Sequence, residues 1–364
     1  MTLHFYFARR FLWTFLAIFG VFFLFQVLLD LVEQIRRFDN SVSFGEVMRL
    51  TLLNTPDGMY QILPLVMILS SIALFVSLAR SSELVVARAA GRSGLMAILG
   101  PMVVALVIGA LTVAMGNPIV AATSKAYADL RETYRSGGTS ALSIGAEGLW
   151  LRQSDPRGQT VIRAARANPN GTVLYDVMFV AYAEDGGPIR RIEAEEATLG
   201  DGAWTLQQVK VWPLVAGLNP ETNAVEHDEL TVASTLTEDS IRDRFGRPSA
   251  ISVWELRGFI TDLEDAGFSA RRHEVWLQME MARPVFLLSM VLIGAAFTMR
   301  HTRMGGTGVA VLSAVLLGFT LYYIRNFAQI LGENGQLNAF AAAWVPPLAS
   351  ILLALGLILN REDG

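Results

Sequence analysis

Two adjacent arginines, Arg36 and Arg37, follow the first long apolar run of the chain, within the charged segment DLVEQIRRFD. A guanidinium presents a planar fork of N–H donors that suits phosphate oxygens, so this pair could bind an anionic lipid headgroup. Arginines at the end of a membrane helix are also ordinary headgroup anchors, and composition alone slightly favours that alternative. In both cases the expected chemistry is recognition of anions at a membrane surface.

A second polar segment, Arg80 to Gly94 (RSSELVVARAAGRSG), separates two apolar runs that are each long enough to cross a bilayer. It predicts a helix of about two to three turns: Ser81 or Ser82 can cap its start, and Glu83 lies in the first turn, where the helix dipole favours an anion. Gly91 suits the left-handed conformation that ends a helix. In an arbitrary membrane protein such a segment is most often an interfacial turn. A capped helix could instead present Glu83 to another protein.

The residues that would carry catalysis or nucleotide binding are missing from the sequence. The phosphate-binding motif G-x-x-x-x-G-K-[ST] needs a lysine before Ser or Thr, but Lys125 precedes Ala126 and Lys210 precedes Val211. There is no cysteine and no G-x-S-x-G motif, and the 4 histidines are scattered, so no catalytic, metal or cofactor site is expected. No Lys/Arg-rich tract points to nucleic acid. If the chain takes part in active transport, another subunit must handle ATP.

The elements that must position these groups are membrane helices. With 52% hydrophobic and 17% charged residues and a mean hydropathy of +0.42, the chain is too apolar for a soluble enzyme of this size. A loop is expected between the first span and Pro56. Apolar runs of sufficient length predict six membrane spans, at residues 11–29, 58–79, 93–124, 284–299 with an earlier start, 304–324 and 334–360. The distribution of arginines places both termini in the cytoplasm.

Between the third and fourth spans the sequence changes to short alternating segments separated by turn residues. Asp201 and Gly202 form a two-residue hairpin signal between two of these segments. Strands are expected at residues 148–153, 160–165, 172–183, 190–198, 203–215 and 229–234. Their spacing predicts a β sandwich or jelly roll. Its apolar interior could shield acyl chains or simply fill a core, and is expected to contain Val161, Leu174, Val177, Phe179, Trp204 and Leu206.

The chain therefore divides into three parts: residues 1–124 with three spans, the β insertion at 125–249, and residues 250–364 with the last three spans. The third part begins with an amphipathic helix, because Val253, Leu256, Ile260 and Leu263 recur at helical spacing. Near the outer end of the fourth span, the i,i+3 spacing of Glu280 and Arg283 lets them form an ion pair.

Two of these segments resemble the LptF/LptG family of lipopolysaccharide-export permeases. Val32 to Arg37 fits the pattern V-[DE]-Q-[IL]-[KR]-[KR], although this chain has Asp30 where many relatives place a basic residue. A later Gly148-Leu149-Trp150 stretch, together with the -VV- form of the polar segment, looks more like the LptG branch than the LptF branch. The polar segment fits S-E-[LI]-x-V-x-x-A-x-G through Ser82, Glu83, Leu84, Val86, Ala89 and Gly91.

The resemblance implies a non-catalytic subunit of an ABC exporter in the bacterial inner membrane. Residues 81–91 would form a cytoplasmic coupling helix that docks on an LptB-like ATPase dimer through Glu83, Leu84, Ala87, Arg88 and Gly91. Arg36, Arg37 and, more loosely, Arg325 would meet the lipopolysaccharide headgroup. The insertion would be a periplasmic jelly roll with Phe179 and Leu206 on an acyl-chain path. Implied partners are an LptF-like permease subunit, an LptC-like bitopic protein and an LptA-like periplasmic bridge.

Three other functions compete with this interpretation. A membrane-anchored periplasmic scaffold would have no use for the acid-headed segment at Glu83. An ion-coupled secondary transporter usually carries acids in the middle of its spans, and the centres of the six apolar runs lack Asp and Glu. A lipoprotein-release permease is also driven by an ATPase, but it usually has four spans and an insertion directly after the first.

Overall fold

A computed structural model describes most of the chain, which forms two compact units. The helical unit comprises residues 1–134, 249–254 and 271–364, and the β unit comprises residues 135–248 and 255–270. Within these units the structure describes residues 2–38, 42–83, 86, 89, 94–136, 142–145, 148–155, 158–168, 172–183, 187–200, 202–214, 217, 219–234, 236, 248–265, 269–299 and 306–362.

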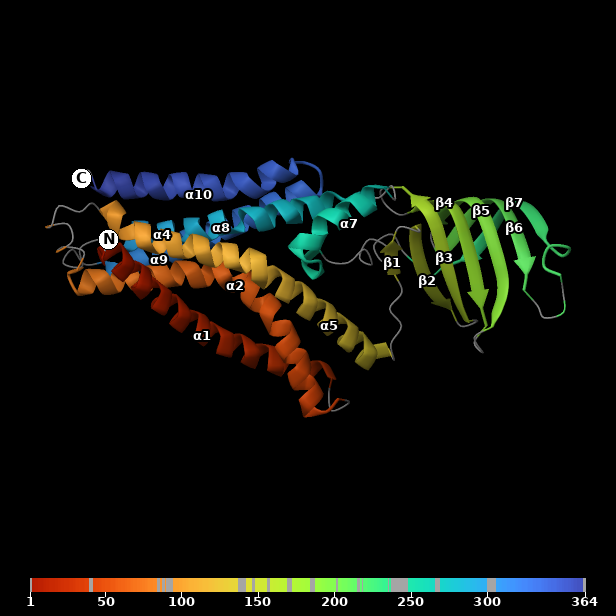
Figure 1. Ribbon diagram of the computed structural model, residues 1–364, viewed down its shortest axis with the longest axis horizontal. Helices are drawn as coiled ribbons and strands as arrows, with labels where there is room; N and C mark the ends of the chain where they lie inside the picture. The colour runs from red at the N-terminus through yellow and green to blue at the C-terminus, as the bar shows by residue number, and fades with distance from the viewer. Residues whose placement is uncertain are drawn as a thin grey trace. The chain divides into compact units, whose positions relative to one another are not determined.

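The helical unit contains, among the described residues, six helices long and apolar enough to cross a membrane (Figure 1). They are α1 (Thr2–Phe38), α2 (Phe44–Arg80), α4 (Gly94–Leu111) with its continuation α5 (Asn117–Ser136), α8 (Arg271–Thr298), α9 (Thr307–Glu333) and α10 (Ala339–Glu362). Helix α8 is the most buried because α2, α4, α9 and α10 all pack against it. The expected six-span architecture with an inserted β domain is confirmed.

The second span begins earlier than the sequence analysis expected, and the loop expected up to Pro56 is wrong. Helix α2 starts at Phe44 and contains Pro56. Its start is fixed by a capping box, in which the backbone N–H of Ser43 donates to Oε2 of Glu46 at 2.9 Å. The S-x-x-E signature was the missed signal, and proline is tolerated within membrane helices.

Helices α4 and α5 are joined by a π-helical segment, Thr112–Gly116. This segment and the residue after it bind the start of a later helix. The indole N–H of Trp254 donates to the carbonyl oxygen of Ala114 at 3.1 Å, and the backbone N–H of Val253 donates to Oδ1 of Asn117 at 2.7 Å. These bonds hold the first residues of α7 (Val253–Asp265), the helix that the apolar spacing predicted. In the π-helical segment the carbonyl oxygen of Ala114 is thus available to Trp254, whereas in a regular α-helix it would accept a backbone hydrogen bond.

The β unit is an antiparallel sheet in which each described strand pairs with the next one along the chain. The strands are β1 (Leu142–Gly145), β2 (Gly148–Asp155), β3 (Gly158–Ala167), β4 (Val173–Tyr182), β5 (Pro188–Gly200), β6 (Ala203–Pro213) and β7 (Val225–Ala233). All six expected strands are present, and the short β1 was not predicted. The order is a continuous meander, without the crossovers of a Greek-key jelly roll.

One face of this sheet is apolar and closed. Leu174, Val177, Phe179, Trp204 and Leu206 are buried as expected, and the rings of Phe179 and Trp204 meet edge to face at 6.3 Å. The expectation for Val161 is wrong, because it is only half-buried while its neighbour Ile162 is fully buried and pairs with Phe179. Successive residues of a strand point to opposite faces, so an error of one position exchanges inside for outside.

An ion pair is buried in the core of the helical unit, as the i,i+3 spacing predicted. The Nη2 of Arg283 lies 2.6 Å from Oε1 of Glu280, and the two side chains are 7% and 0% exposed. The guanidinium carbon of Arg283 lies 3.9 Å from the centre of the Tyr60 ring, and the Tyr60 hydroxyl donates to Glu280. Arg325 is electrostatically coupled to the same carboxylate. Glu280 therefore offsets two buried guanidiniums in a region where unpaired charge is costly.

Glu280→Gln should destabilise the protein strongly, because it leaves both guanidiniums buried without a carboxylate. Breaking a buried pair typically costs about 3 to 5 kcal/mol. Thermal unfolding in detergent measures the effect. The matched control is Glu33→Gln, which removes the partner of Arg37 from an exposed i,i+4 pair and should change little. Equal melting temperatures for the two variants would contradict this assignment.

Candidate functional site

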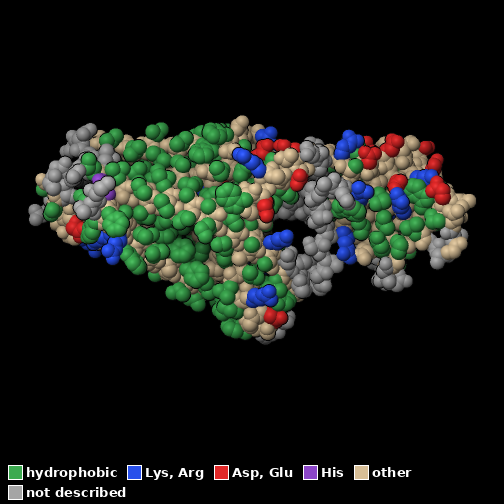
Figure 2. Space-filling model, viewed as in Figure 1, with side chains coloured by type: hydrophobic (Ala, Val, Ile, Leu, Met, Phe, Trp, Pro, Cys, Tyr) green, Lys and Arg blue, Asp and Glu red, His purple; other side chains and the backbone are tan. Residues whose placement is uncertain are grey.

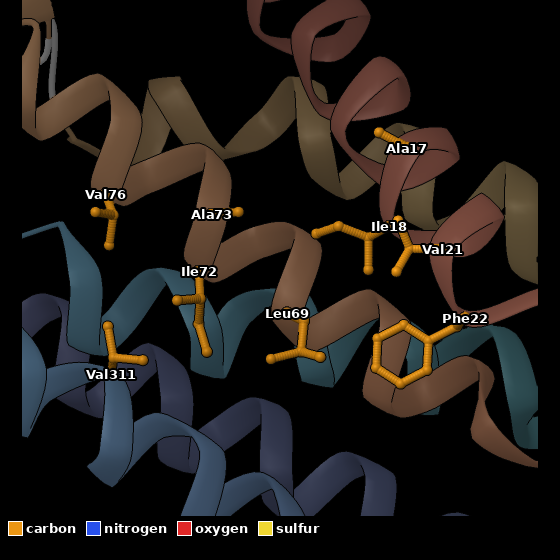
Figure 3. A pocket seen from close by; sticks show the side chains of 9 residues that line it. All are labelled: Ala17, Ile18, Val21, Phe22, Leu69, Ile72, Ala73, Val76 and Val311. Atoms are coloured by element: carbon orange, nitrogen blue, oxygen red, sulfur yellow. The ribbon is translucent and has the colours of Figure 1, made fainter. Parts of the chain in front are cut away.

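An apolar groove of about 490 Å³ lies against the middle of α1 and α2. In Figure 3, side chains from these two helices and one from α9 surround the space. The lining residues are Ala17, Ile18, Val21 and Phe22 of α1, Leu69, Ile72, Ala73 and Val76 of α2, and Val311 of α9. None of these side chains carries a polar atom, so the groove can hold hydrocarbon but cannot recognise a charged group.

The groove is lined in part by α1 and α9, which are the two least buried of the six spans found among the described residues. In the most apolar stretch of α1 only 11% is buried, and the same holds for α9. In α8 the buried share is 78%. Large side chains such as Leu24 and Phe25 stand exposed on α1. Figure 2 shows hydrophobic side chains over most of the visible face of this unit. Such a surface must be covered by lipid or by other membrane helices.

Beyond the groove toward the N-terminal end of α1, Glu83 is held by several hydrogen bonds. Arg10 donates from Nη1 to Oε1 at 2.6 Å and to Oε2 at 2.8 Å. The hydroxyl of Tyr6 donates to Oε2 at 2.9 Å, and the hydroxyl of Ser81 donates to Oε1 at 2.7 Å. A second nitrogen of Arg10 donates to Ser77 of α2 at 3.0 Å. The predicted docking acid is therefore bound to the first span.

Burial acts to raise the pKa of Glu83, but the hydrogen bonds from Arg10, Ser81 and Tyr6 outweigh it, and the net pKa lies below its usual value. The carboxylate is therefore ionised throughout the neutral range. Because the folded-state pKa is lowered, its contribution to stability is present above the unfolded pKa and is lost only as the pH falls through the folded value.

The backbone around Glu83 differs from the expected cap. Ser81 is the C-cap of α2, and Ser82 has a φ of 57°, a left-handed conformation that is uncommon for residues other than glycine. The carbonyl of Ser82 accepts the N–H of Val86 at 3.1 Å, so helical structure resumes there, and Val86 is exposed. The other predicted coupling residues, Leu84, Ala87, Arg88 and Gly91, lie outside the described residues.

At the other end of α1, Arg36 and Arg37 are exposed, and Arg37 pairs with Glu33. Asp30 is instead buried against α2, where it accepts hydrogen bonds from Gln26 at 3.1 Å and from Thr55 at 3.5 Å. The acid at this position therefore forms part of a helix contact. Its role was not predicted, because the partner on α2 is distant in sequence.

Arg325 does not share the exposed surface of Arg36 and Arg37. Its side chain is buried, its guanidinium carbon lies 4.9 Å from the centre of the Phe286 ring, and Nη2 donates to the carbonyl of Met279 at 3.5 Å. Phe179 and Leu206 are also fully buried, in the closed face of the sheet. The structure thus brings together Glu83 and Arg10, a residue that the sequence analysis did not single out.

These features define a multi-pass membrane protein with an apolar groove, an inserted antiparallel β domain and no nucleotide-binding motif in its sequence. Residues 5–360 match the family described as lipopolysaccharide export system permease LptF/LptG. The chain belongs to this family.

Similar curated proteins agree with the family match. The chain is 25% identical over 344 residues to the lipopolysaccharide export system permease protein LptG of Haemophilus influenzae, covering 93% of this chain and 92% of the relative. It is 23% identical over 318 residues to LptG of Escherichia coli K12, covering 86% and 85% of the two chains. Both relatives belong to the LptG branch, as the sequence motifs indicated.

Proposed function

We propose that the chain is the LptG-like permease subunit of an ABC exporter that extracts lipopolysaccharide from the bacterial inner membrane and passes it to a periplasmic bridge. The observation that carries this proposal is the apolar groove of α1, α2 and α9, which is lined in part by the two least buried of the described spans. In a chain of this family, an apolar space accessible from the bilayer suits acyl chains, because each buried methylene contributes about 0.8 kcal/mol.

The headgroup of such a lipid must lie beyond the groove, which offers it no polar partner. Arg36 and Arg37 are on the same helix, roughly 21 Å past Phe22 at the rise of an α-helix, and both are exposed. We assign them to the phosphates of the lipid. Arg325 can join them only if it leaves its position against Phe286, so its assignment requires movement of α9 relative to α8.

Energy comes, in this proposal, from an LptB-like ATPase dimer that docks at Glu83. The exposed positions Val86 and Ala89 lie on the helical structure after Ser82, and we assign the contact to this segment together with Leu84, Ala87, Arg88 and Gly91. Both termini would then be cytoplasmic and the β unit periplasmic. Six spans make half of the usual twelve-span pore, so an LptF-like subunit would complete it.

The β unit would receive lipid and contact an LptC-like protein and an LptA-like bridge. Phe179 and Leu206 are fully buried in its apolar face, so an acyl chain could reach them only if the sheet opens. Phe179 and Leu206 can therefore belong to the acyl-chain path only when the sheet opens. The groove of α1, α2 and α9 needs no such change.

Two buried acids bear on the ion-coupled alternative and do not favour it. Glu280 is paired with Arg283 and accepts a hydrogen bond from Tyr60, and Asp30 accepts hydrogen bonds from Gln26 and Thr55. Carboxylates committed in this way to helix contacts support packing rather than a proton or sodium pathway.

Glu83→Ala should loosen or uncouple the ATPase subunit without unfolding the helical unit, because Glu83 and Arg10 form a partly exposed pair that contributes little to stability. Co-purification of the ATPase and ATP-driven lipopolysaccharide release measure the effect. Glu333→Ala, at the C-terminal end of α9, is the matched control and should behave as the parent. Full ATPase retention and export by Glu83→Ala would overturn the coupling assignment.

Replacing Arg36 and Arg37 together by Ala should reduce the lipopolysaccharide that co-purifies with the complex while leaving its basal ATPase rate near normal. Each charge-assisted hydrogen bond lost at the interface is worth about 1.5 to 3 kcal/mol. Arg9→Ala, at the opposite end of the same helix, controls for loss of charge. Unchanged bound lipid in the double variant would return both arginines to the role of headgroup anchors.

A further inference from the structure

The carboxylate of Glu83 accepts four hydrogen bonds from within the chain. Oε1 accepts from Arg10 and Ser81, and Oε2 accepts from Arg10 and Tyr6, at distances between 2.6 and 2.9 Å. Arg10 and Tyr6 both belong to α1 and lie one helical turn apart, where they also bond to each other at 2.8 Å. The segment that follows α2 is therefore tied to the first span through one acid.

The backbone at Ser81 and Ser82 positions Glu83 for its contact with Arg10. Charge attraction between the two side chains contributes little to this contact. Ser82 adopts its left-handed conformation directly before Glu83, and Ser81 orients the carboxylate from the end of α2. The side chains of Arg10 and Glu83 are 30% and 32% exposed, so water screens their attraction. A contact of this kind contributes little to folding and much to the relative position of two helices.

The same end of α1 also packs closely on α4, the helix that follows the polar segment. A Cβ atom at Gly100 would lie 2.4 Å from the carbonyl oxygen of His4 and 3.4 Å from the Cβ of Ala8, so the two helices meet nearly backbone to backbone. The start of α1 therefore has two contacts. It binds Glu83, which follows α2, and it packs on Gly100, near the start of α4.

From this end, α1 runs without interruption to the groove. Ala17 lies about two turns, roughly 10 Å, beyond Arg10, and it lines the groove together with Ile18, Val21 and Phe22. The described part of α1 has no buried residue between Phe15 and Asp30. Because α1 is one continuous helix over this length, displacing its start also displaces the stretch that lines the groove.

We propose that Arg10 is a positioning residue that links Glu83 to the first span, so that displacement of the segment after α2 moves α1 and changes the width of the groove. This inference rests on the proposed function, in which an ATPase displaces that segment. Glu83 then has two tasks, contact with the ATPase and attachment to α1, and Arg10 has only the second.

The test measures groove width in the assembled complex. Because the chain has no cysteine, Trp13→Cys on α1 and Leu312→Cys on α9, both exposed, can carry spin labels, with accessible cysteines of the partner subunits replaced. Distances are recorded by pulsed electron resonance without nucleotide and after ATP and vanadate. The parent should show a nucleotide-dependent shift between the labels.

Arg10→Gln should retain the ATPase subunit at the parent level but lose most of this shift. Its lipopolysaccharide release should be several-fold lower than that of the parent. Arg10→Lys should restore part of both, since it keeps one charged donor. The exposed neighbour Arg9→Gln should match the parent.

Parent-like shift and release in Arg10→Gln would overturn the inference while leaving the proposed function intact. Loss in Arg10→Lys equal to that in Arg10→Gln would also overturn it, because a charged donor would then not matter. Failure of the proposed function has a different signature, which is ATPase retention together with normal export in Glu83→Ala.

Discussion

The first span is held to the rest of the helical unit by contacts at its two ends, and this constraint governs the functional surface. Near its start, Phe7 and Phe11 are fully buried and Arg10 binds Glu83. Near its other end, Asp30 accepts from Thr55 across the contact with α2. Between these attachments the helix exposes its apolar side chains, and the groove lies along that stretch. Hydrocarbon can therefore approach the chain along this stretch.

The rest of the helical unit is closely packed around α8, beside the less buried α1. Helix α8 is surrounded by neighbours, and small residues let them approach: a Cβ atom at Gly294 would lie 2.7 Å from Ser71, and one at Gly109 would lie 2.6 Å from Pro284. The Glu280 and Arg283 pair adds polar contacts to α2 through Tyr60. A fixed core beside a span that has no described residue fully buried between Phe15 and Asp30 is a suitable arrangement for opening toward lipid.

Most of the architecture followed from local sequence patterns. Spans and strands depend on apolar length and on alternation, so their number and order could be predicted. The start of α2 does not follow from the charge-free run at 58–79, because the helix begins upstream of that run, at the capping box of Ser43. Val161 was misplaced because a strand's inward face depends on register with its neighbours. The short β1 carries too few residues to show a pattern.

The candidate site was predictable only in part. Glu83 was found from a family motif, but its partner Arg10 lies 73 positions away and forms a pair that no local spacing reveals. The burial of Arg325 likewise depends on how α8 and α9 pack. The groove itself has no sequence signature, because its lining residues are the same aliphatic side chains that fill any membrane helix. Long-range packing decides these features.

We propose that the groove of α1, α2 and α9 takes the acyl chains of lipopolysaccharide. Photo-crosslinking from a residue introduced at Ala73 or Phe22 tests it most directly, in the complete complex with and without ATP, beside the exposed control position Val345 on α10. We expect lipopolysaccharide adducts at Ala73 and Phe22 whose yield depends on ATP, and fewer, ATP-independent adducts at Val345. Equal yields at all three positions, unaffected by ATP, would contradict it.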